Sequence, residues 1–398
     1  MADERAEVIV LGAGIVGTAL AFHLTERHVG PVVVFDPRTP GAGATGRAAG
    51  IVSEQLWDRW DVEVVRESKE EYARLSRRWD PSAYRTIGFA RWTSDPEIAA
   101  ALRSSTERLR SWGVGVGPIS SDALFRRVPV ARCDDILEAA WHPDDAVVTP
   151  SAMTELYAEA ARRAGVQFLL GAPLGSFTAD GDSWKLSTAG RTVRARRAVV
   201  AAGAWSKRLL ASVGRPLPLV PYRTQAALLR PPSPSDVLLP SVHDLDLDVY
   251  ARPEDEGRVL AGDGTEKVEA DPETFVPSGD ASFVAHLAES FDRRFPGWKD
   301  ADLVRAWAGV CTATPDRRPL IGPVPGASGL YCITGFNGFG VMRAGGAARR
   351  LTEAIASGGA ESAFGGLSTV LPGRFGADPP EFLPQPGFTL EAGARPRF

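Results

Sequence analysis

The pattern of hydrophobic and polar positions predicts a β-α-β unit at the beginning of the chain. Residues 7–11 form a short β-branched run bounded by glycine, as expected for a buried parallel strand. Residues 18–25 have helical character, and a second apolar strand over 31–35 ends at an acidic residue. Strand, glycine-rich turn, helix, strand and acid therefore follow one another in the order of a dinucleotide-binding unit.

The glycine-rich turn has the spacing of the dinucleotide fingerprint. Gly12 permits the tight turn out of the strand, Gly14 lets a pyrophosphate approach the backbone, and Gly17 lets the helix pack close to the sheet. The helix N-terminus offers unpaired N–H groups and a partial positive charge to phosphates. Asp36, 24 residues after Gly12, can accept hydrogen bonds from both ribose hydroxyls and would repel a 2′-phosphate. The unit disfavours NADP but does not distinguish NAD from FAD.

Beyond this unit, the patterning predicts alternating helices and strands. Helices are expected over 53–79, 96–112, 149–165 and 280–295. Strands are expected over 88–93, 166–170, 177–195 and 197–205. Residues 366–398 are rich in Pro and Gly and end in basic residues, so we expect a tail laid on the surface or partly disordered.

Two further segments contain clustered glycines. Residues 40–50 form a small-residue loop that is either a flexible surface loop or a backbone track along a cofactor, with Arg47 facing phosphate or flavin. Residues 329–355 repeat the order strand, glycine turn and helix. A second helix N-terminus of this kind would point at a different part of the cofactor. Oriented N–H groups there stabilise reduced flavin, which is anionic around N1 and C2=O.

Composition narrows the function classes. The chain has 398 residues, 44% hydrophobic and 24% charged, which suits a soluble globular protein of two domains. A net charge of -4 argues against a broad surface for nucleic acid or anionic lipid. Three cysteines form no disulfide framework, which favours a reducing compartment. The five histidines are scattered without ligand spacing, so no metal site is expected.

The apolar run over 8–22 is not expected to be a signal peptide or a membrane span. Acidic residues precede it, three glycines interrupt it, and it is too short to cross a bilayer. We therefore expect a cytoplasmic protein. Abundant Ala, Arg, Gly and Pro with few Lys point to a GC-rich, bacterial genome.

Together these pieces resemble the D-amino-acid oxidase family of FAD-dependent oxidoreductases, which includes glycine oxidase, sarcosine oxidase, D-arginine dehydrogenase and dimethylglycine dehydrogenase. No single piece is specific, but their order and spacing over residues 8–355 are. The matching segments are Gly12-x-Gly14-x-x-Gly17, Thr45–Gly50, Asp145–Pro150, Val200–Trp205, Thr314-Pro-Asp316 with Ile321-Gly-Pro323, and Gly335–Gly340.

The resemblance implies an α/β fold with a discontinuous, Rossmann-like FAD-binding domain. That domain would comprise 1–52, 145–220 and 310–365, and a substrate domain built on a mixed, largely antiparallel β-sheet would comprise 53–144 and 221–309. It also implies non-covalent FAD and hydride transfer to flavin N5 from a C–H beside nitrogen, which gives an imine. The substrate would be an amine or an N-alkyl or cyclic amino acid derivative, and O2 or an electron carrier would be the acceptor. The cofactor carries the hard chemistry, so no general base is obligatory.

The resemblance and the turn chemistry assign candidate site residues. Substrate contact or catalysis is expected of Tyr250, Cys311, Phe336 and Met342. Cofactor contact is expected of Gly12, Gly14, Ile15, Val16, Gly17, Asp36, Pro37, Arg38, Thr45, Gly46, Arg47, Ala49, Gly50, Ile51, Ala202, Gly203, Trp205, Gly335, Asn337, Gly338, Phe339, Gly340 and Val341.

The chain departs from the family pattern where substrate is held. Members that oxidise free amino acids typically carry Arg three residues before the motif threonine, and that arginine clamps the substrate carboxylate. Cys311 occupies this position, so a simple amino acid held there is not expected. Tyr250 matches a tyrosine that contacts the carboxylate in glycine oxidase-like members, or it is a sheet tyrosine with its hydroxyl in water. Arg91 and Arg223 are candidates for a replacement anion clamp.

Other departures concern flavin attachment, oxygen and the pocket. Sarcosine oxidase-like members attach flavin through a cysteine at the position of Gly309, so covalent attachment is not inherited. Cys311 is either a second attachment point or a small pocket-lining residue. A lysine that activates oxygen aligns with Leu260, which makes a dehydrogenase plausible. Phe336 replaces a usual histidine. Phe336 and Phe339, with Trp57 or Trp92, would line an aromatic pocket or pack in the core.

Four alternative functions stay open at this stage. Within the family, oxidation of a 2-hydroxy acid competes with amine oxidation. An FAD- and NADPH-dependent hydroxylase is suggested by residues 258–263, although the residues that should follow are missing. An NAD-dependent dehydrogenase would use only the first unit. A non-catalytic flavoprotein that acts as a partner is consistent with the absent arginine.

Overall fold

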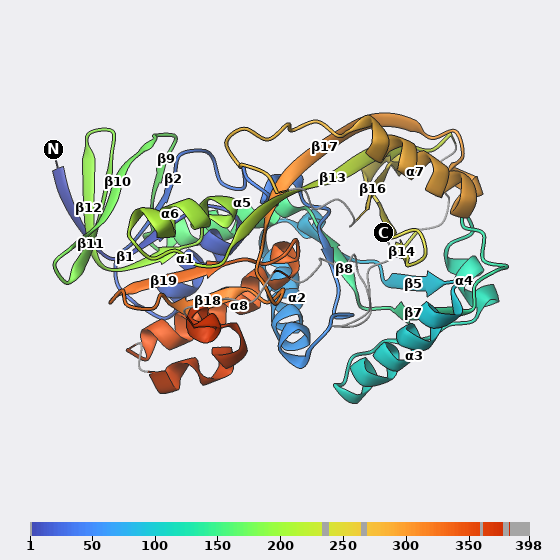
Figure 1. Cartoon of the computed structure of the whole chain (residues 1–398), viewed down its shortest axis with the longest axis horizontal. Helices are drawn as coiled ribbons and strands as arrows, with labels where there is room; N and C mark the ends of the chain where they lie inside the picture. Colours follow the sequence, from blue (N-terminus) through green and yellow to red (C-terminus); the bar gives the residue numbers. More distant parts are fainter. Residues whose placement is uncertain (1, 233–238, 264–268, 359–360, 377–381, 383–398) are drawn as a thin grey trace.

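Two large sheets lie side by side along the long axis of the molecule (Figure 1). The computed structural model describes residues 2–232, 239–263, 269–358, 361–376 and 382. Most of the expected tail, 377–381 and 383–398, lies outside the described residues. Among the helices that are described, none has the length and apolar character needed to cross a membrane.

The first sheet has a parallel core. Its strands run in the order β10-β11-β12-β1-β2-β9, with β19 added beside β12 and β18 beside β19. β1 pairs in parallel with both β2 and β12, so the carboxyl ends of these strands meet at one edge. The strands are β1 (Ala2–Leu11), β2 (Val32–Asp36), β9 (Gln167–Leu170), β10 (Leu174–Asp180), β11 (Ser183–Thr188), β12 (Arg191–Val200), β18 (Leu320–Pro323) and β19 (Leu330–Thr334).

Four helices cover one face of this sheet and form its main core with β1 and β2. They are α1 (Ile15–Glu26), α2 (Arg59–Trp79), α5 (Pro150–Arg163) and α8 (Gly340–Ala356). The other face packs against α6 (Ser206–Ser212) and the β10–β11 hairpin. Because the sheet is buried on both faces, its central strands are continuous apolar runs.

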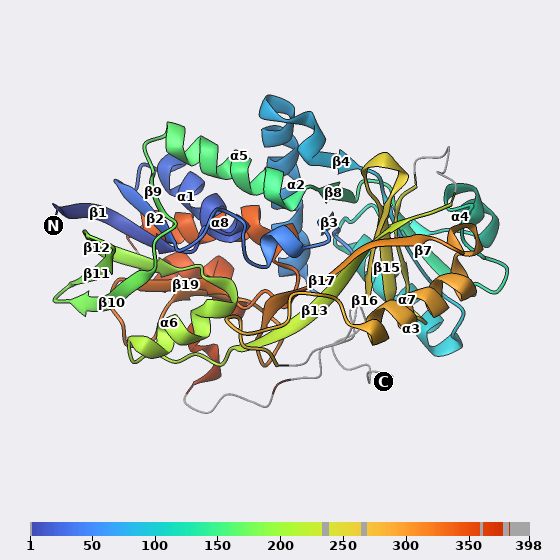
Figure 2. The same cartoon turned by 90° about the horizontal axis from the view of Figure 1, so that it is seen from above.

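The second sheet is antiparallel at every pairing except β14 with β5. Its order is β17-β13-β16-β15-β14-β5-β7-β6. The two longest strands, β13 and β17, extend from this sheet toward the first (Figure 2). The strands are β5 (Phe89–Thr93), β6 (Gly117–Pro118), β7 (Glu138–His142), β13 (Val220–Arg230), β14 (Ser241–Asp244), β15 (Val249–Pro253), β16 (Val259–Asp263) and β17 (Asp302–Ala313).

The two faces of the second sheet differ in character. Side chains alternate along each strand, and one set forms an apolar core with α7 (Ala281–Arg294). Trp92 belongs to this set. Arg91 and Tyr250 lie on the opposite face, which we call the site face. The helices α3 (Pro96–Ser111) and α4 (Ser121–Arg127) complete this half of the molecule.

A small third sheet joins the two halves. β3 (Ile51–Val52) pairs with β8 (Ala146–Val148), which pairs with β4 (Tyr84–Thr86). It carries the chain from the glycine loop of the first half toward the second. The predicted fold class, α/β with a largely antiparallel second sheet, is confirmed by these topologies.

Two predicted boundaries are wrong. β1 begins at Ala2 instead of residue 7, because its polar half pairs with β12 and its glutamates neutralise arginines there: Glu4 meets Arg191 at 2.6 Å. The helix expected from residue 53 begins only at Arg59. Asp58 caps it by accepting a hydrogen bond from the Asp61 N–H at 2.9 Å.

Candidate functional site

The turn between β1 and α1 has no room for side chains. Gly12 has φ +115°, and a Cβ there would lie 2.5 Å from the Ala201 carbonyl oxygen. A Cβ at Gly17 would lie 1.9 Å from the Gly12 carbonyl oxygen. The N-cap residue of α1, Gly14, has no side chain to cap the helix, the first turn contains no acidic residue, and within the described structure the Thr45 hydroxyl is bound only to the Ile15 N–H. Its N–H groups therefore form a site that suits an anion.

Asp36 lies at the carboxyl end of β2, directly beside this turn. One carboxylate oxygen accepts a hydrogen bond from the Ala13 N–H and the other from the Arg38 N–H, both at 2.9 Å. Each oxygen has a second lone pair, so the carboxylate can also accept from ribose hydroxyls. The exposed Arg38 guanidinium stacks on the Trp205 ring, 4.2 Å from its centroid.

The small-residue loop over 41–50 is packed against the second sheet. The Arg47 guanidinium folds back and donates to the Ala42 and Gly43 carbonyls at 2.6 and 2.9 Å. Trp307 donates from its indole N–H to the Arg47 carbonyl at 3.0 Å. Arg252 donates to the Ala49 carbonyl. These contacts fix the loop against the second sheet, and its role as a backbone track along a cofactor stays a prediction.

Positive charge accumulates around this loop. Burial, together with the neighbouring cations Arg38 and Arg305, lowers the pKa of Arg47. At its other end, Gly50 has φ +74° and leads into β3, where Ile51 pairs with Val147. The remaining loop candidates are Thr45, whose hydroxyl accepts from the Ile15 N–H at 3.2 Å, and Gly46, whose N–H donates to the Gly41 carbonyl at 2.8 Å.

The turn after β19 supplies the second helix N-terminus. Asn337 has φ +53° and holds the turn together: its amide donates to the Gly335 carbonyl at 2.7 Å, and its side-chain oxygen accepts from the Thr314 N–H at 3.1 Å. The Thr-Pro-Asp motif thus braces the turn. α8 begins at Gly340 with no side-chain cap and no acidic residue in its first turn. Tyr72 donates to the Val341 carbonyl at 2.5 Å.

The segment after β12 lies between these two turns. Ala201 abuts Gly12, and the Thr334 hydroxyl donates to the Gly203 carbonyl at 3.3 Å. Ala202, Gly203 and Trp205 follow on directly, so the predicted cofactor residues come together along the carboxyl edge of the parallel sheet.

Three side chains of the site face meet beside the second turn. Tyr222 lies opposite Cys311 in the β13–β17 register, close enough for each group to shift the pKa of the other, and a Cβ at Gly338 would lie 3.2 Å from the Tyr222 hydroxyl. Tyr250 lies flat over Gly262, where any Cβ would be 2.3 Å from the tyrosine oxygen. Tyr250 and Cys311 are close enough to interact electrostatically.

The ionisable groups of this cluster are all neutral at physiological pH. Burial raises the pKa of the Cys311 thiol to about 11. Burial, with the nearby Asp263 carboxylate, raises the pKa of Tyr250, and burial with Cys311 raises that of Tyr222. The cluster therefore offers hydrogen-bond donors and no ready base. Gly309, two residues before Cys311, lies against Arg47, with a Cβ there 3.3 Å from the arginine side chain.

Of the candidate pocket-lining side chains, some are buried in a core and others lie at its edge. Phe336 and Met342 are 8% and 5% exposed and belong to the core of the first half. Phe339 meets Trp57 edge-on, with ring centroids 4.7 Å apart. Trp92 is a core residue on the α7 side of the second sheet, so pocket lining is wrong for it.

The two candidate anion clamps differ in what they bind. The Arg223 guanidinium donates hydrogen bonds to the Asp280 carboxylate, at 2.6 and 3.0 Å, and to two backbone carbonyls. It is not available as a clamp, and that prediction is wrong. Arg91 is buried on the site face and donates to the Gln55 side-chain oxygen at 3.0 Å.

Sequence reasoning missed Tyr222, Trp307, Arg252 and Gln55. Each contacts a predicted site residue through the fold, over separations of 36 to 260 residues. The alternation along 220–230 and 249–253 marked the strands, but only the β13–β17 register places Tyr222 opposite Cys311.

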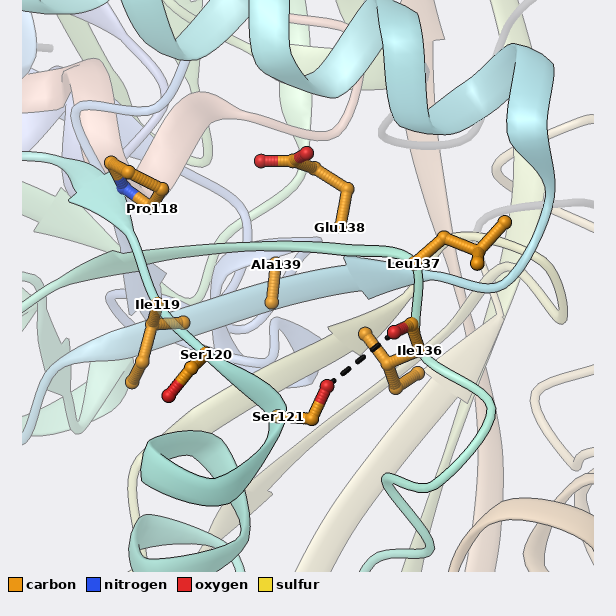
Figure 3. A pocket seen from close by; sticks show the side chains of 8 residues that line it. All are labelled: Pro118, Ile119, Ser120, Ser121, Ile136, Leu137, Glu138 and Ala139. Atoms are coloured by element: carbon orange, nitrogen blue, oxygen red, sulfur yellow. Dashed lines mark hydrogen bonds between the residues drawn. The ribbon is translucent and has the colours of Figure 1, made fainter.

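A separate hollow lies away from this site. It has a volume of about 500 Å³ and lies at the far edge of the second sheet, between β6 and the start of β7 (Figure 3). The Ser121 hydroxyl donates to the Ile136 carbonyl at 3.4 Å within it. None of the predicted site residues lines it. Within the described part of the chain, no group of three or more His, Cys, Asp or Glu could hold a metal ion.

The residues present fit an FAD molecule. Gly12 and Gly17 leave the backbone of the first turn bare, neither helix is capped by the side chain of its own N-cap residue, and Asp36 retains acceptor capacity. The first turn with Asp36 suits the ADP half, and the second turn beside the site face suits the flavin ring.

Comparisons with known proteins agree with this geometry. Dimethylglycine dehydrogenase of Rattus norvegicus is 27% identical over 378 residues, which cover 89% of this chain and 43% of the rat protein. The chain thus spans less than half the length of that relative. Glycine oxidase of Geobacillus kaustophilus is 25% identical over 347 residues, which cover 85% of this chain and 90% of the oxidase.

A solved structure and a family model extend the comparison to the whole fold. The crystal structure of L-proline dehydrogenase from P. horikoshii matches with a TM-score of 0.84 and 25% identity, over 90% of this chain and 95% of that one. The family model described as FAD dependent oxidoreductase (DAO) matches residues 7–354. This chain belongs to the DAO family of FAD-dependent oxidoreductases.

Proposed function

We propose that this protein oxidises an amine or an amino acid derivative at the carbon beside nitrogen and releases an imine. The observation that carries the proposal is the meeting of the second helix N-terminus with the site face, where Gly338 lies against the Tyr222 hydroxyl and Tyr222 lies opposite Cys311. FAD bound there would supply the two-electron oxidant that accepts the hydride. The nitrogen lone pair forms the new C=N bond, and water hydrolyses the imine after release.

The cofactor is proposed to be held without a covalent bond. The bare first turn and the α1 N-terminus would bind the pyrophosphate, and Asp36 the ribose. Gly309 has no nucleophile, and Cys311 is a neutral thiol engaged by Tyr222. The loop over 41–50 and the turn over 335–341 would fix the flavin ring between the two halves.

The side chains of the site face are proposed to bind and orient the substrate. Tyr222 and Tyr250 keep their protons, so both can donate hydrogen bonds to an oxygen of the substrate. With no charged base in this cluster, the substrate amine must arrive neutral or lose its proton to water. Activity is then expected to rise with pH toward the pKa of the substrate amine.

The electron acceptor and the cellular setting are further proposals. Leu260 lies on the site face where a family lysine would activate oxygen, which favours an electron carrier over O2. Cys133, Cys311 and Cys332 are free thiols, which supports a reducing, cytoplasmic setting, and the composition supports a bacterial source.

An anaerobic screen of flavin reduction tests the function. The FAD-loaded protein is mixed with N-methyl, cyclic and D-amino acids and, as a second class, with 2-hydroxy acids. We expect the flavin absorption band to bleach with at least one amine. Bleaching by hydroxy acids alone would replace amine oxidation by hydroxy-acid oxidation, and bleaching by neither class would contradict both.

A further inference from the structure

Arg91 is a buried cation with an incomplete set of partners. Only 3% of its surface is exposed, and its Nη2 group has no hydrogen-bond partner within the described residues. Its Nε donates to the neutral Gln55 amide at 3.0 Å. Burial lowers the pKa of Arg91 to about 10, so it is still charged at neutral pH. A buried guanidinium normally meets a carboxylate, because an unpaired buried charge is costly.

The nearest carboxylate, Asp145, is already engaged. It accepts from the Ser53 hydroxyl at 2.6 Å, from the Glu54 N–H at 3.0 Å and from the Gln55 amide at 3.1 Å. Asp145 interacts with Arg91 through charge, but no hydrogen bond joins them in the described structure.

The surrounding cluster has one positive charge in excess. Glu54 pairs with Lys69 at 2.7 Å and with Arg66 at 2.9 Å, and Lys69 also lies 3.5 Å from Asp145. With Arg91 included, three cations face two carboxylates. One further anion would balance the cluster and satisfy the open N–H of Arg91.

Arg91 lies on the same row of the site face as Tyr250. β5 and β14 place Arg91 opposite His243, and β14 and β15 place His243 opposite Tyr250. The next residue along this row is Gly262, over which Tyr250 extends toward Cys311. On its other side, Arg91 contacts Gln55, four residues after Ile51 of the glycine loop.

We propose that Arg91, oriented by Gln55, binds the carboxylate of the substrate, which is therefore an amine that bears an acid group. This rests on the proposed function and adds a substrate class to it. The substrate carboxylate would lie at the β5 side of the site face, and not at β17, where Cys311 offers no charge. The open Nη2 group and the excess positive charge are then satisfied only when substrate is bound.

Binding of a shape-matched pair of probes tests this. Pyrrole-2-carboxylate and pyrrole-2-carboxamide are flat, aromatic analogues of proline whose substituted ring carbon has no hydrogen to transfer, and only the first is charged. Each is titrated into the FAD-loaded protein, and binding is followed by the change in the flavin spectrum and in the thermal midpoint. We expect the wild type to prefer the carboxylate.

Arg91→Met should weaken the binding of pyrrole-2-carboxylate by about 100-fold and the binding of pyrrole-2-carboxamide by less than about threefold. Arg91→Lys keeps the charge but loses the planar guanidinium, so about a tenfold loss of affinity for the carboxylate is expected. This variant replaces Arg91→Met if the Met variant does not fold. Arg223→Met is the matched control, because that arginine is saturated by Asp280 on the same sheet, and it should leave the preference unchanged.

The outcomes are distinct. Equal binding of the two probes by the wild type, undetectable binding included, overturns the proposal, as does an unchanged preference in the Arg91 variants. Because neither probe can be oxidised, these results do not depend on turnover. The amine screen can fail while the preference for the carboxylate stands, which would contradict the proposed function alone. The preference can also be absent while an amine reduces the flavin, which would contradict the role of Arg91 alone.

Discussion

The parallel sheet and the antiparallel sheet present their functional groups by different means. At the first sheet, the candidate site consists of backbone N–H groups and bare glycines in short continuous segments, such as 12–17 and 335–341. At the second sheet, it consists of single side chains from separate strands, such as Arg91, Tyr250 and Cys311.

Under the proposed function, this difference separates cofactor binding from substrate choice. The backbone site tolerates few substitutions at Gly12 and Gly17, because a Cβ at either position would collide with a main-chain carbonyl oxygen. A side-chain site can be rebuilt one residue at a time while the sheet stays intact. The replacement of a family arginine by Cys311 is a change of the second kind. The predictions below challenge this division, beginning with the largest expected effect.

The first prediction concerns the backbone site. Gly17→Ala should abolish retention of FAD and destabilise the fold by on the order of 3 kcal/mol, since its Cβ would lie 1.9 Å from the Gly12 oxygen. Flavin content after purification and urea unfolding measure the two effects. Gly117→Ala is the control, because nothing lies within 4 Å of a Cβ there. Wild-type flavin content in the Gly17 variant would refute a steric role.

The second prediction concerns the charge state of the thiol at the side-chain site. The pKa of Cys311 is raised from its ordinary value of 9.0 to about 11, so the thiol stays protonated through neutral pH and ionises only as pH rises through 11. At pH 9 roughly 1% should be thiolate, instead of half. The rate of iodoacetamide labelling at Cys311, read by peptide mass, should follow this curve, with Cys311→Ala as the blank. Full labelling at pH 9 would contradict it and reopen covalent flavin attachment.

The third prediction alters the side-chain site directly. Cys311→Arg restores the family clamp beside Tyr222 and Tyr250, and should lower the Michaelis constant for a simple amino acid about tenfold. Cys311→Ser, which adds no charge, is the control. An unchanged Michaelis constant with retained FAD would mean that position 311 does not set substrate choice.

The fourth and smallest prediction tests the link between the two regions. Trp307→Phe removes the indole hydrogen bond to the Arg47 carbonyl. It should weaken the binding of FAD about fivefold, equivalent to roughly 1 kcal/mol. Trp184→Phe loses a similar bond to the Ser328 carbonyl, far from the site, and should leave FAD affinity unchanged. Equal effects of the two variants on FAD would argue against a specific role of Trp307 in holding the glycine loop.

The first β-α-β unit could be predicted because its signals are local. The glycine spacing, the apolar runs and Asp36 all lie within one short segment, and each acts through its own backbone. The errors arose at element ends. The polar start of β1 becomes a strand only because β12 supplies Arg191 and its neighbours, and residues 53–58 leave the helix to surround Asp145.

The side-chain site could be predicted only in part. Tyr250 and Cys311 came from the family resemblance, but nothing local indicates that Tyr222 lies opposite Cys311. Arg91 and Arg223 were equivalent as strand arginines. Their difference depends on partners distant in the chain, since Asp280 lies 57 residues from Arg223 and Gln55 lies 36 residues from Arg91.

The sequence by itself determined the family, the cofactor class and the position of the first glycine turn, because these follow from backbone requirements that a few adjacent residues impose. Only the tertiary structure decided which cation is left unsatisfied and which face of the second sheet meets the second glycine turn. Burial and charge balance are properties of strands brought together by packing, and no single segment of this chain contains them.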